Sequence, residues 1–349
     1  MRVGLVGFAA AGKTTVFNAL TGLSADTGYG GKDRANLGII KVPDARVEIV
    51  SRVFEPKKKT LAEIAFVDVA GPEAKSTESG LDTRITNEMR QVDALVHVVR
   101  DFESPLLTRP PDPLRDLAVF EGEVVLTDLV QVDTRLERLR KEGTKSQERT
   151  LIEHLHAHLE AGKPLRNYDL SPSDRQLIHG FALLSIKPCI VLINRADDKA
   201  AAELSPELYE AATERGLTLM SLAARAEEEI GELSPEDQSA FLEDLGLQGS
   251  ARDRFIQTAY AQLDLISFLT VGPDECRAWT IERGTNARAA AGKIHSDLER
   301  GFIRAEVIAF SDFEEHGSEA KCRDVGKLRV EGKDYVVQVG DLLHISFNV

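Results

Sequence analysis

The first residues that could carry out chemistry form a short run near the N-terminus, from Gly7 to Thr14. Gly7 and Gly12 allow a tight loop whose backbone N–H groups can point inward. Lys13 adds an ammonium group, and Thr14 adds a hydroxyl. Two glycines separated by four residues and followed by this pair are typical of a loop that binds phosphate, with the ammonium on the outer phosphate oxygens and the hydroxyl on magnesium.

Such a loop must connect a buried strand to the start of a helix, and the flanking residues meet this requirement. Arg2–Val6 is a short apolar run, and Thr14–Leu20 has the apolar spacing of a helix. The helix N-terminus would add its partial positive charge to the site. A chance glycine-rich turn is the weaker interpretation. The residues that we predict to hold nucleotide phosphates are Gly7, Ala10, Ala11, Gly12, Lys13, Thr14 and Thr15.

A second motif follows the apolar run from Ile64, which ends with Asp68 and Gly71 in the spacing D-x-x-G. We expect Asp68 to hold magnesium through water and the Gly71 N–H to bond the γ-phosphate. This spacing alone is common. Together with the loop, it predicts that Lys13, Thr14 and Gly71 act on the triphosphate and that Thr14 and Asp68 form the metal site.

A third motif closes another apolar run, Pro188–Ile193, and reads N-R-x-D from Asn194 to Asp197. It differs by one residue from the N-K-x-D motif that recognises guanine. A carboxylate at Asp197 could accept from N1–H and the exocyclic amino group of guanine, whereas adenine offers neither donor in that arrangement. Arg195 stands in place of the lysine. We predict that Asn194, Arg195, Asp197 and Ser221 contact the base, with GTP or GDP favoured over ATP or ADP.

The three motifs occur in the order expected of a G domain, each at the carboxyl end of an apolar run. Ligands of open α/β sheets bind at those ends. We therefore predict an α/β fold, a P-loop NTPase domain with a mostly parallel sheet.

The interval between Gly71 and Asn194 is longer than a minimal domain of this type needs. Leucines at helical spacing within it predict an antiparallel helical hairpin, and short strand-like runs near the C-terminus predict a small α+β module. The predicted ranges are 1–112 and 178–262 for the P-loop domain, 113–177 for the hairpin and 263–349 for the module.

Composition limits the partners and the cellular compartment that the protein could have. The net charge of −14 disfavours binding of nucleic acid through overall charge, so any RNA contact must be a local patch. No run approaches the roughly 18 apolar residues needed to span a membrane, and we expect a cytoplasmic protein without a membrane partner. Cys189, Cys276 and Cys322 are widely spaced, which predicts reduced thiols and neither a disulfide framework nor a zinc site.

Over nearly its full length the chain resembles the YchF family, in the Obg branch of P-loop GTPases. The similar segments include Asn36–Asp44, Phe66–Gly71, Val92–Arg100, Arg277–Ile281, Ala290–His295 and Glu331–Tyr335. The resemblance implies a helical coiled-coil insertion, a C-terminal TGS domain, slow nucleotide hydrolysis and a ribosome or RNA partner. Arg277, Arg283, Arg288 and Lys293 could supply local positive charge for that partner.

Several positions depart from the family pattern. Ala10 replaces the asparagine that helps related GTPases bind potassium, which argues against a K⁺ cofactor. The switch I threonine would fall near Lys32, with Thr27 close by, and Pro72 cannot orient an attacking water. Family members often carry glutamate where this chain has Asp197, and they lean toward ATP.

Two function classes therefore stay open. The first is a nucleotide-dependent switch that hydrolyses its triphosphate slowly. The second is a binding protein that has lost turnover, and single-turnover hydrolysis would distinguish the two. A metabolic kinase is a weaker alternative, because it gives no role to the order of the second and third motifs.

Overall fold

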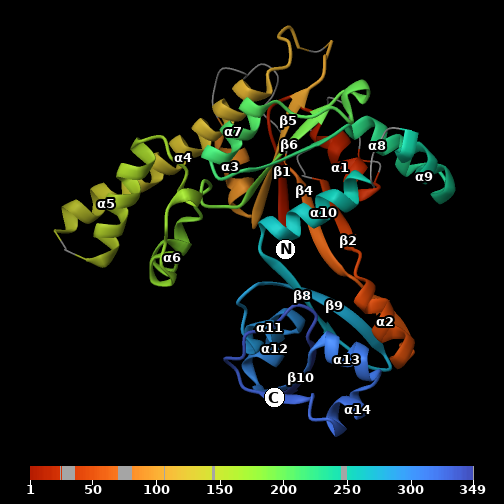
Figure 1. The fold of residues 1–349 in the computed structure, drawn as a ribbon. Helices are drawn as coiled ribbons and strands as arrows, with labels where there is room; N and C mark the ends of the chain where they lie inside the picture. Colours follow the sequence, from red (N-terminus) through yellow and green to blue (C-terminus); the bar gives the residue numbers. More distant parts are fainter. Residues whose placement is uncertain are drawn as a thin grey trace. The chain divides into compact units, whose positions relative to one another are not determined.

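The computed structural model describes residues 1–23, 25, 36–69, 81–105, 107–143, 146–244 and 250–348 (Figure 1). The predicted residue Gly71 lies outside these residues, as do Thr27, Lys32 and Pro72. The chain divides into two compact units. One comprises residues 2–38 and 65–255, and the other comprises residue 1, residues 39–64 and residues 256–349.

The first sheet has six strands among the described residues, in the order β2-β4-β1-β5-β6-β7. Strand β1 pairs in parallel with both β4 and β5, and parallel pairing continues through β6 to β7. Their carboxyl ends therefore lie on one edge of the sheet, which confirms the predicted α/β class. The strands are β1 Arg2–Val6, β2 Asn36–Val42, β4 Ala62–Asp68, β5 Ala94–Asp101, β6 Cys189–Arg195 and β7 Thr218–Leu222.

The two central strands show why the sequence folds this way. Seven residues of β5, from Ala94 to Arg100, and all of β6 are buried. Branched apolar residues dominate both strands, as expected of parallel strands covered on both faces. These runs fix β5 and β6 in the interior and leave their carboxyl-terminal residues to begin the loops of the site.

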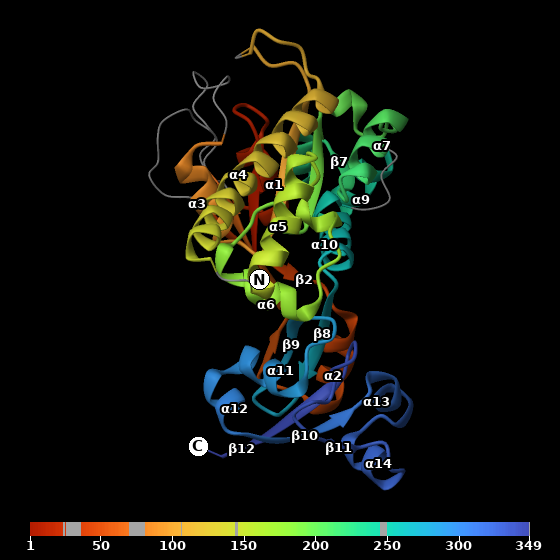
Figure 2. The ribbon, with the colours of Figure 1, turned by 90° about the vertical axis from the view of Figure 1, so that its left-hand side faces the viewer.

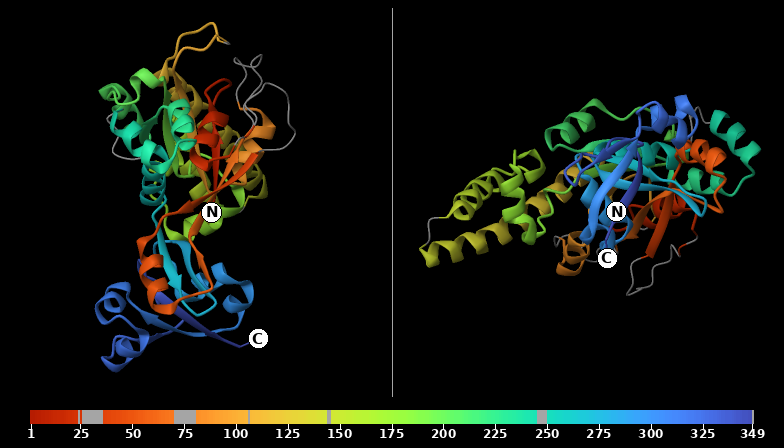
Figure 3. Two further views of the ribbon diagram at one scale, coloured as in Figure 1. Left: turned by 90° about the vertical axis from the view of Figure 1, so that its right-hand side faces the viewer. Right: turned by 90° about the horizontal axis from the view of Figure 1, so that it is seen from below.

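Helices cover the sheet and extend beyond it. In chain order they are α1 Lys13–Thr21, α3 Thr83–Arg90, α4 Pro113–Glu142, α5 Gln147–Glu160, α6 Pro172–Ile178, α7 Pro206–Glu214, α8 Ala224–Gly231 and α9 Pro235–Asp244. Short 3-10 turns lie at η2 Leu165–Asn167, η3 His179–Phe181 and η4 Asp197–Lys199. Helices α4 and α5 lie side by side and project from the sheet (Figures 2 and 3), as the leucine spacing predicted.

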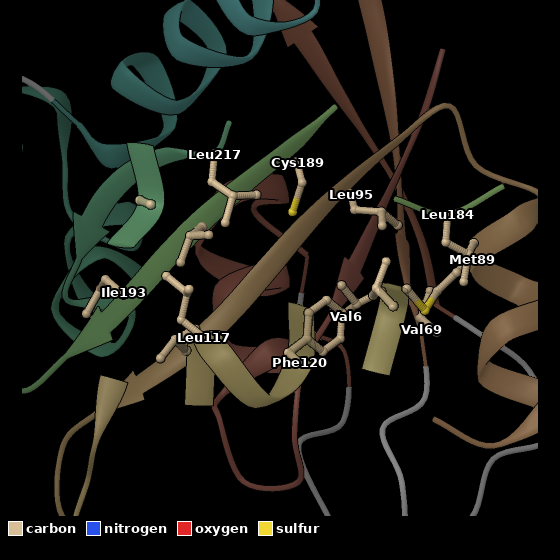
Figure 4. Close-up of a cluster of buried hydrophobic side chains, with 14 of the residues drawn as sticks. Val6, Val69, Met89, Leu95, Leu117, Phe120, Leu184, Cys189, Ile193 and Leu217 are labelled. Carbon is tan, nitrogen blue, oxygen red and sulfur yellow. The ribbon is translucent and has the colours of Figure 1, made fainter. Parts of the chain in front are cut away.

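Helix α4 belongs to two hydrophobic cores. Its first half packs Leu117, Phe120 and Val124 against the sheet, in the cluster drawn in Figure 4. Its second half packs Val132 and Leu136 against α5. The hairpin is thus a continuation of a helix that already covers the sheet, and it lies in the same compact unit as the sheet.

Two buried polar groups fix the base of this hairpin. Asp128 of α4 accepts hydrogen bonds from the backbone N–H groups of Leu184 and Ser185, at 2.8 and 2.7 Å. Burial raises the pKa of Asp128, and these bonds to its carboxylate oppose the rise. Arg166 pairs with Glu121 of α4 at 2.5 Å, and both side chains are buried.

The second unit contains a sheet with the order β11-β10-β12-β8-β9-β3 among the described residues. Its strands are β3 Lys58–Thr60, β8 Leu265–Thr270, β9 Glu275–Glu282, β10 Phe302–Ile308, β11 Arg329–Glu331 and β12 Leu342–Phe347. Its helices are α2 Ala45–Phe54, α11 Ala287–Ile294, α12 Ser296–Arg300, α13 Phe310–His316 and α14 Glu319–Asp324, and α10 Ala251–Gln262 spans the division between the units.

Residues 39–64 join this second unit although they lie far from it in sequence. Strand β3 pairs in parallel with β9, from Lys58 opposite Glu275 to Thr60 opposite Arg277. Phe54 of α2 stacks on Phe313 with ring centroids 5.8 Å apart. Residues 39–64 were predicted within the P-loop domain, whereas the compact units group them with the C-terminal residues. The ranges given for the hairpin and the C-terminal module remain predictions.

The cysteines are free and buried, as predicted for reduced thiols. Burial raises the pKa of the Cys189 thiol to about 12, which keeps it protonated near neutral pH. Within the described part of the chain, no helix is both long enough and apolar enough to cross a membrane.

Candidate functional site

The candidate site lies where the parallel strands of the first sheet end. The loop after β1, Asp68 at the end of β4, the segment after β5 and the segment after β6 all meet at this edge, because these strands are parallel neighbours. Sequence motifs that are far apart along the chain are therefore brought together here.

Both glycines of the phosphate loop are required by close contacts. Gly7 has a φ of 143°, and a Cβ placed on it would lie 2.4 Å from the Val98 carbonyl oxygen. Gly12 has a φ of 81°, and its Cβ would lie 2.2 Å from Asn194 Nδ2. Any larger residue would push the loop away from β5 or β6.

The remaining loop residues shape a cradle. Ala10 adopts a left-handed φ of 58°, which costs a non-glycine residue some free energy. Helix α1 begins at Lys13, and the Lys13 Nζ donates to the carbonyl oxygens of Gly7 and Phe8, each at 3.0 Å. The lysine therefore reaches back over the loop, as a phosphate-contacting ammonium must.

Burial makes the Lys13 ammonium easier to deprotonate. Desolvation lowers the pKa of Lys13 to about 8 from an ordinary value of 10.5, and the nearby Asp68 carboxylate partly opposes the change. Phosphate oxygens would supply the negative charge that the buried ammonium lacks.

The predicted metal ligands face each other. Thr14 Oγ1 donates to Asp68 Oδ2 at 3.0 Å, and Asn36 Nδ2 donates to the same oxygen at 3.3 Å. A hydroxyl and a carboxylate together form a set of hard oxygen donors that suits magnesium. The geometry thus fits the ion expected beside a triphosphate in such a loop.

Asn194 links the phosphate loop to the segment predicted to hold the base. Its Nδ2 donates to the carbonyl oxygen of Ala11 at 3.1 Å, and its Oδ1 accepts from the Ala224 N–H at 3.2 Å. The side chain is buried. One amide therefore joins the loop after β1, the end of β6 and the start of α8.

Arg195 is held away from the phosphate loop. Its Nε donates to Asp101 Oδ2 at 3.2 Å, and its Nη1 donates to the Ala202 carbonyl oxygen. Lys199 approaches the same carboxylate at 3.7 Å. The guanidinium is consequently fixed as part of the wall of the site.

A cavity of about 690 Å³ opens from the phosphate loop toward these residues. Asp197, which is exposed, lines it, as does Thr15 of α1, and both were predicted to contact the nucleotide. Ser221 lies within β7 and does not line the cavity. Lining residues that no motif predicted include Asn18, Phe102, Arg225 and Glu228.

The segment after β5 carries Phe102 into the cavity wall. Arg100 is buried, and its two terminal nitrogens donate to the carbonyl oxygens of Phe102 and Arg109, each at 2.9 Å. The position of this segment directly after a buried parallel strand is the signal that could have pointed to Phe102.

A buried histidine lies beneath the phosphate loop. His97 stacks on Phe120 of α4 with ring centroids 3.9 Å apart, and its ring meets Phe8 edge-on at 6.4 Å. Burial, aided by the charge of Lys13, lowers the pKa of His97 to about 3. The His97 ring is therefore neutral near pH 7 and packs between the phosphate loop and α4.

The sheet order, the glycine-lysine loop and the Asn194 segment define a P-loop nucleoside triphosphatase of the G-domain class. The 50S ribosome-binding GTPase family model matches residues 2–149, and the YchF-GTPase_C model matches residues 265–348. The chain belongs to the YchF family.

Individual relatives support this assignment along the whole chain. The ribosome-binding ATPase YchF of Bacillus subtilis is 36% identical over 365 residues, which covers 100% of both chains. That of Haemophilus influenzae is 36% identical over 362 residues, covering 100% of this chain and 99% of the relative. The solved structure of the Schizosaccharomyces pombe YchF GTPase is 30% identical with a TM-score of 0.86, covering 99% of this chain and 97% of that one.

The lowered pKa of Lys13 predicts a pH dependence of stability in the nucleotide-free protein. Between about pH 8 and 10.5 the unfolded chain keeps a proton on Lys13 that the folded chain has released. The free energy of unfolding should therefore gain a contribution that increases with pH across this window, by roughly 3 kcal/mol at most. Urea unfolding can be measured below pH 8 and again near pH 10. Between these two pH values, the free energy of unfolding of Lys13→Met should lack this increase.

Lys163→Met is the matched control, because Lys163 is exposed and lies in the turn after α5. Its pH dependence should follow that of the unmutated protein. If the stability of Lys13→Met showed the same pH dependence as that of the unmutated protein, the lowered pKa of a buried Lys13 would be contradicted.

Proposed function

We propose that this protein is a nucleotide-dependent switch that binds a nucleoside triphosphate at Gly7–Thr15 and hydrolyses it slowly. The observation that carries the proposal is the preformed cradle: two glycines in tight contact, the Lys13 ammonium folded over the loop, and Thr14 bonded to Asp68. Because these groups already lie together around the loop, binding of phosphates would require little further ordering of them.

Thr14 and Asp68 are the residues that would hold magnesium in this proposal. The ion would neutralise charge on the β- and γ-phosphate oxygens. Lys13 would transfer its hydrogen bonds from the Gly7 and Phe8 carbonyl oxygens to phosphate oxygens, and the N-terminus of α1 would add its partial positive charge. Ala10 offers no side-chain oxygen, so we propose no potassium requirement.

We further propose that the base is guanine. Asp197 exposes its carboxylate to the cavity, where it can accept from two donors of guanine. Fixation of Arg195 by Asp101 gives the base a rigid neighbour. The bacterial relatives are named ATPases and the Schizosaccharomyces pombe protein is named a GTPase, so the choice for this chain rests on its own Asp197.

GDP should bind more tightly than ADP, and Asp197→Ala should remove most of that preference. Loss of hydrogen bonds to a charged acceptor predicts a decrease in GDP affinity of about tenfold to a hundredfold, with little change for ADP. Calorimetric titration with both diphosphates measures this. Asp198→Ala is the control, because the neighbouring carboxylate is also exposed and does not line the cavity. Equal affinity of the unmutated protein for ADP and GDP would reject the guanine assignment.

A ribosome is the proposed partner, by analogy with relatives that are named ribosome-binding ATPases. We place one contact on the C-terminal unit, proposed to be a TGS domain, and the protein in the cytoplasm. Arg288 and Lys293 of α11 are both exposed. Arg283 is paired with the Asp264 carboxylate at 2.8 Å and Arg277 lies 4.0 Å over the Trp279 ring, whereas Arg288 contacts a backbone carbonyl, that of Glu299, at 3.2 Å. The two residues on α11 are thus the better candidates for phosphate contacts.

The protein should sediment with ribosomes at low salt and separate from them as salt increases, because phosphate contacts release counterions. Replacing Arg288 and Lys293 together by alanine should weaken binding and reduce the slope of log K against log salt by about 2, roughly one for each contact. Arg283→Ala should change binding much less. Failure of the unmutated protein to sediment with ribosomes at low salt in every nucleotide state would contradict the partner assignment.

A further inference from the structure

One wall of the cavity is formed by α1 and α8, and an asparagine joins the two helices there. Asn18 of α1 is buried, and its Nδ2 donates to Glu228 Oε1 of α8 at 3.0 Å. The same nitrogen donates to the Ala25 carbonyl oxygen at 3.0 Å, and Asn18 Oδ1 accepts from the Ala25 N–H at 2.8 Å. These bonds use both amide hydrogens of Asn18 and hold one oxygen of Glu228 in place.

The second carboxylate oxygen of Glu228 has a different environment. Glu228 is half-buried and lines the cavity, and its Oε2 receives no hydrogen bond from the described residues. An ionised carboxylate can accept several hydrogen bonds, so this oxygen offers a fixed, charged acceptor at the cavity wall.

The position of this acceptor along the cavity points to the ligand group it would meet. Thr15 lines the phosphate end, and Asn18 lies three residues further along α1, about 4.5 Å at 1.5 Å per residue. Asp197, proposed to bind the base, lies on another wall of the same cavity. In a nucleotide the sugar lies between phosphate and base, and its hydroxyls are hydrogen-bond donors.

We propose that Glu228 is a specificity-determining residue that accepts hydrogen bonds from the ribose hydroxyls, with Asn18 as the residue that positions it. This role for Glu228 rests on the proposed nucleotide site, and it means that the site recognises the sugar as well as the phosphates and the base. It predicts that the protein prefers ribonucleotides to nucleotides that lack these hydroxyls.

The test compares GDP with 2′,3′-dideoxy-GDP in the full-length protein. The unmutated protein should bind GDP about tenfold more tightly, because the dideoxy sugar leaves a carboxylate without its donors. Glu228→Gln should bring the two affinities close together. Asn18 still requires an acceptor from residue 228, so the glutamine carbonyl should face Asn18 and its amide nitrogen should face the sugar. That nitrogen can only donate weakly to the hydroxyl oxygens and no longer offers the charged acceptor that strengthens their hydrogen bonds.

Glu232→Gln is the matched control. Glu232 lies at the end of α8, is exposed and does not line the cavity, so its replacement should leave the ratio unchanged. Equal binding of both ligands by the unmutated protein, or an unchanged ratio in Glu228→Gln, would overturn the proposal. An equal decrease for both ligands in Glu228→Gln would show a structural role and would also overturn it. Absence of binding of either ligand by the unmutated protein would refute the nucleotide site itself, and the ribose contact with it.

Discussion

The close approach of Gly12 to the Asn194 amide is the contact on which the site depends. Only a residue without a side chain allows it, since a Cβ on Gly12 would lie 2.2 Å from Asn194 Nδ2. The approach lets Asn194 donate to the Ala11 carbonyl oxygen while its own oxygen accepts from Ala224. Three loops that follow three different strands are thereby held in one geometry around a cavity that Gly12, Thr15 and Asp197 line.

The sheet makes that contact possible, and α4 connects it to the rest of the unit. Parallel pairing of β1 with β5 and of β5 with β6 brings the ends of the strands together. Phe120 of α4 stacks on His97, whose ring also meets Phe8 of the phosphate loop. The same helix continues into the hairpin with α5. Packing therefore runs without interruption from the phosphate loop to the projecting helices, as a switch of this kind would require.

Sequence reasoning predicted the parts of the site that depend on local motifs. The loop from Gly7 to Thr14, Asp68 and Asn194 can be recognised because each needs particular residues at fixed spacing beside an apolar strand. Asn18 and Glu228 could not be found in this way, since they reach the cavity through the packing of elements that are distant in sequence. Ser221 was predicted beside the base but lies within β7 and does not line the cavity, whereas Arg225 of α8 does.

The fold shows the same contrast. Apolar runs and leucine spacing predicted the parallel sheet and the α4–α5 hairpin. Nothing in the local pattern of residues 39–64 revealed that β3 would pair with β9, because pairing between distant segments depends on the whole sheet. If Lys13 completes a phosphate site, the Lys13→Ala protein should bind GTP more weakly than the unmutated protein. We expect GTP affinity to fall at least about tenfold with the fold unchanged, and the exposed-lysine variant Lys163→Ala to bind GTP normally. Unchanged GTP affinity in Lys13→Ala would contradict this role for Lys13.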